Sequence, residues 1–301
     1  MVASGEANIR GIDIDKLAKG FADEDNVMKK FVTVSTTKAR EIRWYQKTAG
    51  FLDSVDTTGI TASQITNTSF RSLPVVVEQS WTRNTSYVKK FFVTSPLLSV
   101  EDINDTDIDI LATNIRDLVR GVERQVDKRI VEILTDANPD GNPLDNGAVT
   151  VQNTTSVADG WNDAVTGNPI KDILVGKRKI RQQGYNPEGS MLGMNSIEHE
   201  FLLDFLISVK GSSIPAFSSE KVRDGVVMGI LGTNVLVSEN FTTDWVIQWV
   251  PDRAVTWKAF MPISSVVIDE PLIGKTIRVS EWGEAILTDP NAVHVISNTT
   301  V

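Results

Sequence analysis

The stretch that decides the fold is residues 101–137, EDINDTDIDILATNIRDLVRGVERQVDKRIVEILTDA. Its apolar side chains recur every three or four positions, the spacing of a one-sided helix: Ile108, Leu111, Ile115, Leu118, Val122, Val126, Ile130 and Ile133. Ser99, three residues before Asp102, fits an N-terminal cap. At ~1.5 Å per residue, some 30 residues would extend roughly 45 Å, longer than the core of a small domain. The sequence therefore predicts one long amphipathic helix over about 101–137.

The segment before this helix predicts a β-hairpin. Residues 73–80 and 85–95 are rich in Val, Phe and Tyr and flank a short turn at residues 81–84. The second strand would carry apolar groups on both faces, and an isolated hairpin is marginal in water. We therefore expect it to be covered by its own chain or by other subunits, and the second option requires a repeating assembly. The candidate assembly-interface residues are Trp81, Arg83, Tyr87, Lys89, Phe91 and Phe92.

Outside this region, residues 1–50 predict a polar arm with short helices near 27–34 and 39–45, and residues 51–70 predict a Ser/Thr-rich lead-in. Asn168-Pro169 predicts a helix start, and Gly184 its end. A short buried strand follows at Met191, and Asn195 or Ser196 would cap another helix. After Gly225 strands dominate, at 226–231, 233–238, 245–250, 254–260, 265–268, 276–282 and 293–296. This order predicts an α+β fold.

Composition narrows the functional classes. The 301 residues are 41% hydrophobic, enough for one large domain or two modest ones. Cysteine is absent, which excludes disulfides and thiolate chemistry. No leader pattern and no long apolar run occur, so neither secretion nor membrane spanning is expected. The net charge of −9 disfavours tight nucleic-acid binding, and the basic group at 177–181 is interpreted as a solvated helix face.

Catalytic patterns are weak throughout the sequence. His199 and His294 lie in different sections without ligand spacing around them. Gly274-Lys275-Thr276 resembles the end of a phosphate loop, but Asp269 stands where that motif needs glycine. Residues 136–141 match the first half of a calcium-binding loop, but Gly147 stands at the twelfth position, where the loop needs a glutamate ligand. We expect no catalytic residue, cofactor or metal, and keep an acidic carbohydrate-active enzyme as an alternative from another class.

The order of arm, hairpin, long helix, helix-strand section and strand-rich end resembles major capsid proteins of tailed bacteriophages with the Hong Kong 97 fold. The most specific stretches are residues 161–193, WNDAVTGNPIKDILVGKRKIRQQGYNPEGSMLG, and 226–241, VVMGILGTNVLVSENF. The resemblance implies an N-terminal arm over 1–50 and an extended loop over 51–96. A peripheral domain with the spine helix would cover 97–167, an axial domain 168–256, and peripheral strands with the C-terminus 257–301.

The same resemblance implies a structural subunit that self-assembles into the icosahedral head enclosing double-stranded DNA, and no enzyme. Its partners would be copies of itself in pentamers and hexamers, a separate scaffolding protein, a portal and a decoration protein. It would be made in the host cytoplasm and reside in the virion, without a membrane. Lys89 and Lys90 lie in the proposed loop, but no acceptor for a lysine-asparagine crosslink is matched. The alternative within the fold is an encapsulin, a bacterial compartment shell protein.

Overall fold

The computed structural model describes residues 28–49, 69–73, 80–105, 110–136, 151, 153–163, 165–209 and 229–300. The chain divides into two compact units, and each unit is built from several separate segments that alternate along the sequence. Unit 1 contains residues 90–125 and 261–282 of the described part, and unit 2 contains the rest. Three long elements run from one unit into the other: α3 (Ile110–Ile133), β11 (Val255–Glu270) and β12 (Gly274–Leu287).

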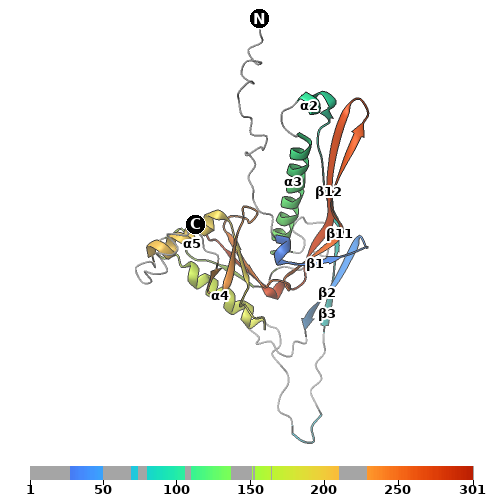
Figure 1. The fold of residues 1–301 in the computed structure, drawn as a ribbon. Helices are drawn as coiled ribbons and strands as arrows, with labels where there is room; N and C mark the ends of the chain where they lie inside the picture. The colour runs from blue at the N-terminus through green and yellow to red at the C-terminus, as the bar shows by residue number, and fades with distance from the viewer. Residues whose placement is uncertain are drawn as a thin grey trace. The chain divides into compact units, whose positions relative to one another are not determined.

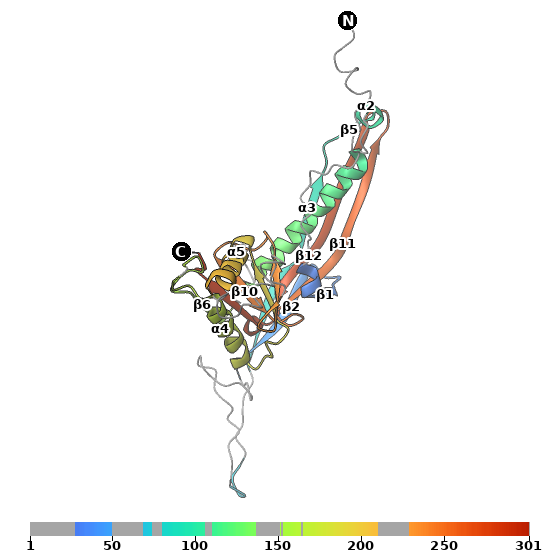
Figure 2. The same cartoon turned by 60° about the vertical axis from the view of Figure 1, so that its left-hand side comes forward.

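Unit 1 is a sheet with a helix on one face. The sheet comprises parts of β11 and β12, with β4 (Lys89–Thr94) beside β12 and β5 (Leu98–Ser99) pairing the start of β12. Residues 110–125 of α3 run along this sheet (Figures 1 and 2). Val122, Ile277 and Val279 are buried between the two layers. Partly buried apolar side chains surround them, namely Phe91, Val93, Leu98, Leu111, Ile115, Leu118, Val119 and Ile263.

The predicted long helix is confirmed in the face that it buries, but its predicted end at about residue 137 is wrong. The structure has a short helix α2 (Val100–Asp105) and the 24-residue α3, with residues 106–109 outside the described part. The backbone N–H of Asp102 donates to Ser99 Oγ at 3.0 Å, as the predicted cap requires. Helix α3 ends at Ile133, and the backbone N–H groups of Thr135 and Asp136 then both donate to the carbonyl of Glu132 in a closing turn.

The predicted hairpin over residues 73–95 is wrong. Its supposed turn lies inside β3 (Ser80–Tyr87), which pairs antiparallel with β2 (Glu41–Ala49). Tyr87 stands opposite Glu41, and Trp81 stands opposite Lys47. Residues 81–84 contain no glycine or proline, and Trp and Thr favour extended backbone. The second expected strand, β4, pairs with β12 instead.

The short helices expected in the first fifty residues are also mostly wrong. Only a 3₁₀ turn, η1 (Met28–Phe31), is helical there among the described residues. The chain continues as β1 (Thr33–Thr36), which pairs in parallel with the start of β11, and then as β2. In β2, Ile42 and Trp44 are buried and Arg43 and Tyr45 are exposed. This alternation has the two-residue period of a half-buried strand.

Unit 2 is built on a six-stranded sheet. Its order is β6-β13-β10-β7-β9-β8, with β13 antiparallel to β10 and parallel to β6. The core contains the fully buried Ile173, Leu192, Met194, Leu202 and Ile296. The remaining bounds in this unit are β6 (Asn153–Ser156), α4 (Pro169–Gln182), β7 (Met191–Met194), α5 (Ser196–Asp204), η2 (Phe205–Val209), β8 (Gly229–Ile230), β9 (Thr233–Val237), β10 (Trp245–Trp249), η3 (Pro290–Ala292) and β13 (Val293–Ser297).

Local signals in this unit are confirmed. The Asn168 side chain accepts from the Lys171 amide at 3.1 Å and caps α4, and Asn195 caps α5 in the same way. Gly184 has φ of +87°, a conformation in which glycine is favoured at a helix end. The predicted strands after Gly225 are found, except that 254–260 and 265–268 belong to one strand, β11. Residues 210–228, which hold the start of this series, lie outside the described part.

Candidate assembly surfaces

The first candidate surface is the exposed face of the two-stranded ribbon formed by β2 and β3, here called the ribbon face. Trp81, Arg83 and Tyr87 lie on alternate positions of β3 and so share this face. Tyr45, opposite Arg83, adds a second large aromatic group that is 63% exposed, and Trp81 is 57% exposed. The sequence interpretation missed Tyr45. Three aromatic side chains around an arginine are the composition of a protein–protein contact.

The opposite face of the ribbon is fixed within unit 2. Ile42 and Trp44 are buried, and they pair across the ribbon with the buried polar residues Ser86 and Asn84. The Trp44 indole N–H donates to the carbonyl of Leu287 at 3.1 Å. The ribbon therefore presents one face to its own unit and leaves the other open.

A close ion pair lies on the open side of the ribbon. Arg43 Nε donates to Glu41 Oε1 at 2.5 Å. This hydrogen bond lowers the pKa of the Glu41 carboxyl and raises that of the Arg43 guanidinium. Both groups are solvent-exposed, so the pair contributes little to folding. Exposed charges of this kind can instead bias the orientation in which a partner docks.

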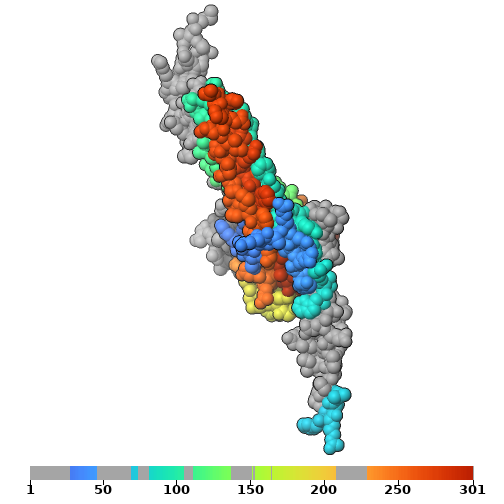
Figure 3. All heavy atoms as spheres, turned by 90° about the vertical axis from the view of Figure 1, so that its right-hand side faces the viewer, coloured from blue at the N-terminus to red at the C-terminus, as the bar shows by residue number. Residues whose placement is uncertain are grey.

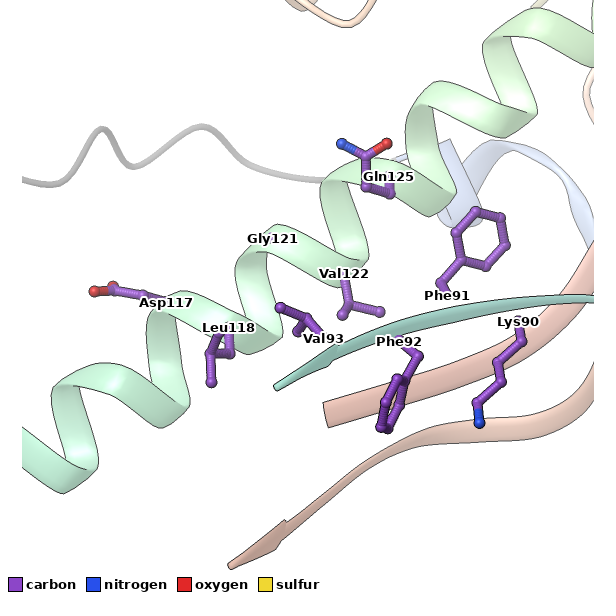
Figure 4. A pocket seen from close by; sticks show the side chains of 9 residues that line it. All are labelled: Lys90, Phe91, Phe92, Val93, Asp117, Leu118, Gly121, Val122 and Gln125. Atoms are coloured by element: carbon purple, nitrogen blue, oxygen red, sulfur yellow. The ribbon is translucent and has the colours of Figure 1, made fainter. Parts of the chain in front are cut away.

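The second candidate surface is the face of the unit 1 sheet that points away from α3, here called the outer sheet face. Figure 4 shows Phe91 and Val93 of β4 pointing toward α3, and Lys90 and Phe92 pointing away from it. Lys90 Nζ lies 4.3 Å from the Phe92 ring centre and 4.8 Å from that of Trp282. Such contacts hold the lysine over the two rings by cation–π attraction. Lys90 and Trp282 were absent from the expected interface.

The outer sheet face is open and partly apolar. Phe92 is 48% exposed, and Val266 of β11 is 57% exposed. Ile263 packs toward α3, so strand alternation places Val266 on the opposite side, the side of Phe92. Figure 3 looks onto this side and shows the β11–β12 hairpin, in orange, uncovered by the other described segments. At the hairpin tip Leu272 is almost fully exposed, with φ of +66°.

The six expected interface residues belong to both units and have different local surroundings. Trp81, Arg83 and Tyr87 share the ribbon face, Phe92 lies on the outer sheet face, and Phe91 packs into the core of unit 1. Lys89 is half-buried at the start of β4. Side chains at adjacent strand positions point to opposite faces of the sheet, so Phe91 and Phe92 lie on different sides.

A cavity of about 420 Å³ lies in unit 1 between β4 and α3 (Figure 4). Its lining is mainly apolar and includes Phe91, Val93, Leu118 and Val122. Gly121 widens it, because a Cβ at that position would meet no atom within 4 Å. No arrangement of nucleophile, base and orienting group accompanies this lining.

Other sites of chemistry are not evident in the described ranges. They contain no group of three or more His, Cys, Asp or Glu side chains placed to hold a metal. No helix among them is long and apolar enough to cross a membrane. His294 is fully buried in β13 and lies against Gly176 of α4 and Gln248. Burial, with a smaller effect of Lys179, lowers its pKa to about 4, so it is neutral near pH 7.

Comparison with known proteins identifies the class. The model of the phage capsid protein family matches residues 97–280, more than half of the chain. The chain belongs to this family. No curated protein matches the sequence.

Solved structures with a similar fold include several from phages. The capsid of the cyanophage P-SCSP1u matches with a TM-score of 0.64 at 8% identity, over 96% of this chain and 94% of that one. A Mycobacterium phage Bobi structure matches with a TM-score of 0.67 at 12% identity, over 99% and 98%. The mature capsid of bacteriophage PhiM1 matches with a TM-score of 0.63 at 12% identity, over 95% and 90%.

These comparisons confirm the resemblance drawn from the sequence and the expected function of a major capsid protein. The encapsulin alternative is not favoured, since the matching family is one of phage capsid proteins. At such low identities the solved structures establish the shared mixed helix-and-sheet fold alone.

Proposed function

We propose that this chain is the structural subunit of an icosahedral head that encloses the double-stranded DNA of a tailed phage. Copies of the chain assemble into pentamers and hexamers, and the protein acts by packing and not by catalysis. The observation that carries this proposal is the family match over residues 97–280, together with a sheet in unit 1 on which the described residues place a helix on one face and exposed apolar side chains on the other.

The domain assignment belongs to the same proposal. Residues 1–50 form the N-terminal arm, 51–96 the extended loop, 97–167 and 257–301 the peripheral domain, and 168–256 the axial domain of a Hong Kong 97-like subunit. The composition of unit 1 from 90–125 and 261–282 supports a peripheral domain built from two distant stretches. The six-stranded sheet of unit 2 supports a separate axial domain, but its strands β6 and β13 come from residues 153–156 and 293–297, so such a domain extends beyond the expected range 168–256.

The two open surfaces supply the contacts between copies. A standard interface buries about 800 Å² on each partner and has aromatic residues and arginine at its centre. The ribbon face offers Trp81, Tyr45 and Arg83 for such a centre, and the outer sheet face offers Phe92 and Val266. Closed symmetry repeats each contact many times, so modest interfaces suffice for a stable shell.

The charge balance suits a container for DNA. With a net charge of −9, the subunit does not grip the phosphate backbone over wide areas. DNA enclosed in such a shell is held by confinement and not by sequence-specific contacts. A scaffolding protein, a portal and a decoration protein are the further partners of the assembly, and the mature subunit resides in the virion.

Electron microscopy of the purified protein tests this proposal. The chain is expressed alone and with its neighbouring genes, concentrated and imaged in negative stain. Closed icosahedral or tubular particles are the expected result, and their diameter distinguishes a phage head from a small compartment. Dispersed monomers under every condition, at high concentration and with a scaffold present, would overturn it.

A further inference from the structure

A second concave surface lies in unit 2, on the outer side of α4, and is here called the α4 pocket. It has a volume of about 350 Å³ and is lined by Leu174, Lys177, Arg178, Arg181, Pro187 and Glu188. Leu174 is 48% exposed, which places an aliphatic group beside the cations.

The wall of the pocket is rigidly built around Lys177. Its ammonium group donates to both oxygens of Glu188, at 3.1 and 3.2 Å, and to the carbonyl of Leu231. Gly232 allows this approach, because a Cβ there would lie 2.5 Å from Glu188 Oε2. Lys177 is thus occupied within the unit, and only 13% of its side chain is exposed.

The remaining charges of the pocket are not balanced. Arg181 approaches Glu188 at 3.6 Å, so this one carboxylate faces two cations. Arg178 is exposed, and no ion pair with it occurs in the part of the chain that the structure describes. Three cations against one carboxylate leave a net positive pocket on a chain whose total charge is −9. Such a pocket attracts an acidic partner, and Leu174 favours one with aliphatic side chains.

The chain itself contains a segment of this chemistry. Residues 101–109, EDINDTDID, carry five carboxylates and no cation, and Ile103 and Ile108 interrupt the acids. The described part of this segment lies in α2, where Glu101 is exposed beside the exposed Val100. In a shell, many copies lie at high local concentration, so even a weak attraction between a pocket on one copy and such a segment on another would suffice for binding.

We propose that the α4 pocket receives the acidic α2 segment of a second copy of this chain. Arg178 and Arg181 pair with carboxylates of that segment, and Leu174 contacts its aliphatic side chains. The contact joins unit 2 of one copy to unit 1 of another and contributes to the register of neighbouring subunits. This inference rests on the proposed shell function.

Disulfide trapping between two differently tagged chains tests the contact, and the absence of native cysteine leaves no competing thiol. One chain carries Arg178→Cys and the other Glu101→Cys, both at exposed positions. The control replaces the first with Lys171→Cys, which lies on the same helix, is exposed and does not line the pocket. The mixture is assembled, oxidised mildly and separated on a non-reducing gel, while electron microscopy follows particle formation.

The expected result is a mixed-tag dimer at least fivefold more abundant with Arg178→Cys than with the Lys171→Cys control. It should form in particles and not in chains that are diluted and disassembled before oxidation. Equal or absent trapping in well-formed particles would overturn the pocket contact and leave the shell function intact. Absence of particles with native chains would overturn both.

A charge exchange provides an independent measurement. Arg178→Glu is expected to reduce particle yield about tenfold, and adding Glu101→Arg on the same chain is expected to restore most of it. If Arg178→Glu leaves assembly unchanged and lowers the DNA retained in particles instead, the pocket contacts nucleic acid and the proposal fails.

Discussion

Unit 1 and unit 2 bury their apolar residues to different extents. The described core of unit 2 contains a cluster of ten buried apolar side chains, whereas that of unit 1 contains three, with eight partly buried neighbours. Unit 1 has α3 on one face of its sheet and exposes apolar groups on the other. A thin core gives less stability on its own. The comparison indicates that unit 2 is stabilised internally, while unit 1 depends more on what covers it.

The largest expected effect is on the core of unit 1. Val122→Asp places a charge at a position that is 3% exposed, among apolar side chains. An unpaired buried charge costs several kcal/mol, so we expect loss of folded protein, measured by circular dichroism and thermal unfolding. Gln125→Asp, at an exposed position of the same helix, is the control and should melt near the native temperature. Native-like melting of Val122→Asp would refute the packing of α3.

The next effect is in unit 2, where Arg129 and Glu284 form a buried ion pair at 2.7 Å. Arg129→Met removes the guanidinium that pairs with the buried Glu284 carboxylate and should destabilise the protein by about 3–5 kcal/mol in urea unfolding. The double variant Arg129→Met with Glu284→Leu should recover most of this loss. The exposed pair of Arg181 with Glu188 supplies the contrast, since Arg181→Met should cost less than about 1 kcal/mol. Equal losses of unfolding free energy for Arg129→Met and Arg181→Met would contradict the conclusion that the buried pair contributes more to stability than the exposed one.

Acid should weaken unit 2 through His294. Its folded pKa of about 4 lies below the ordinary value of 6.5, so the folded state resists protonation. The stability contributed by neutral His294 is complete above pH 6.5 and falls as the pH drops toward 4. The total loss is on the order of 3 kcal/mol at about 1.4 kcal/mol per pKa unit. Urea unfolding at pH 7, 5.5 and 4 measures it. If the free energy of unfolding of His294→Gln fell with pH as steeply as that of the native protein, other groups would be responsible for the effect.

The smallest effect on folding is expected where unit 1 is open. Phe92→Ser removes an exposed ring and should change monomer stability by less than about 0.5 kcal/mol while reducing particle yield. Its neighbour is the matched control, because Phe91→Ser removes a core contact and should cost about 2–3 kcal/mol. Thermal unfolding and negative-stain imaging separate the two outcomes. If Phe92→Ser assembles normally, the outer sheet face is not a contact between copies.

Local signals predicted much of this fold, because their causes are local. The apolar spacing from Leu111 to Val122 and the Asn168 cap are set within a few residues, and both are confirmed. The pairing of β3 with β2 joins segments about forty residues apart. Residues 81–84, which were interpreted as a turn, lie inside β3 and carry no local signal of this pairing. The alternation of Ile42 and Trp44 with Arg43 and Tyr45 was the available signal for β2.

The candidate surfaces could be predicted only in part. Aromatic and basic residue types near positions 81–92 pointed toward a contact region. Division of those residues among the ribbon face, the outer sheet face and the core depends on strand register, which composition does not encode. The contribution of Trp282 to the outer sheet face comes from a strand almost two hundred residues later. The interface role of all these side chains stays a prediction.

The alternation of the two units along the chain has a consequence for the order of folding. Unit 1 joins residues 90–125 to residues 261–282, across a long intervening stretch of unit 2. Strand β13, which lies between β6 and β10, comes from residues 293–297. A growing chain therefore cannot complete unit 1 before residue 282, or the six-stranded sheet of unit 2 before residue 297, has been made. Strand β4 is thus made long before its partner β12, and its apolar side chains lack this neighbour in the growing chain until β12 follows.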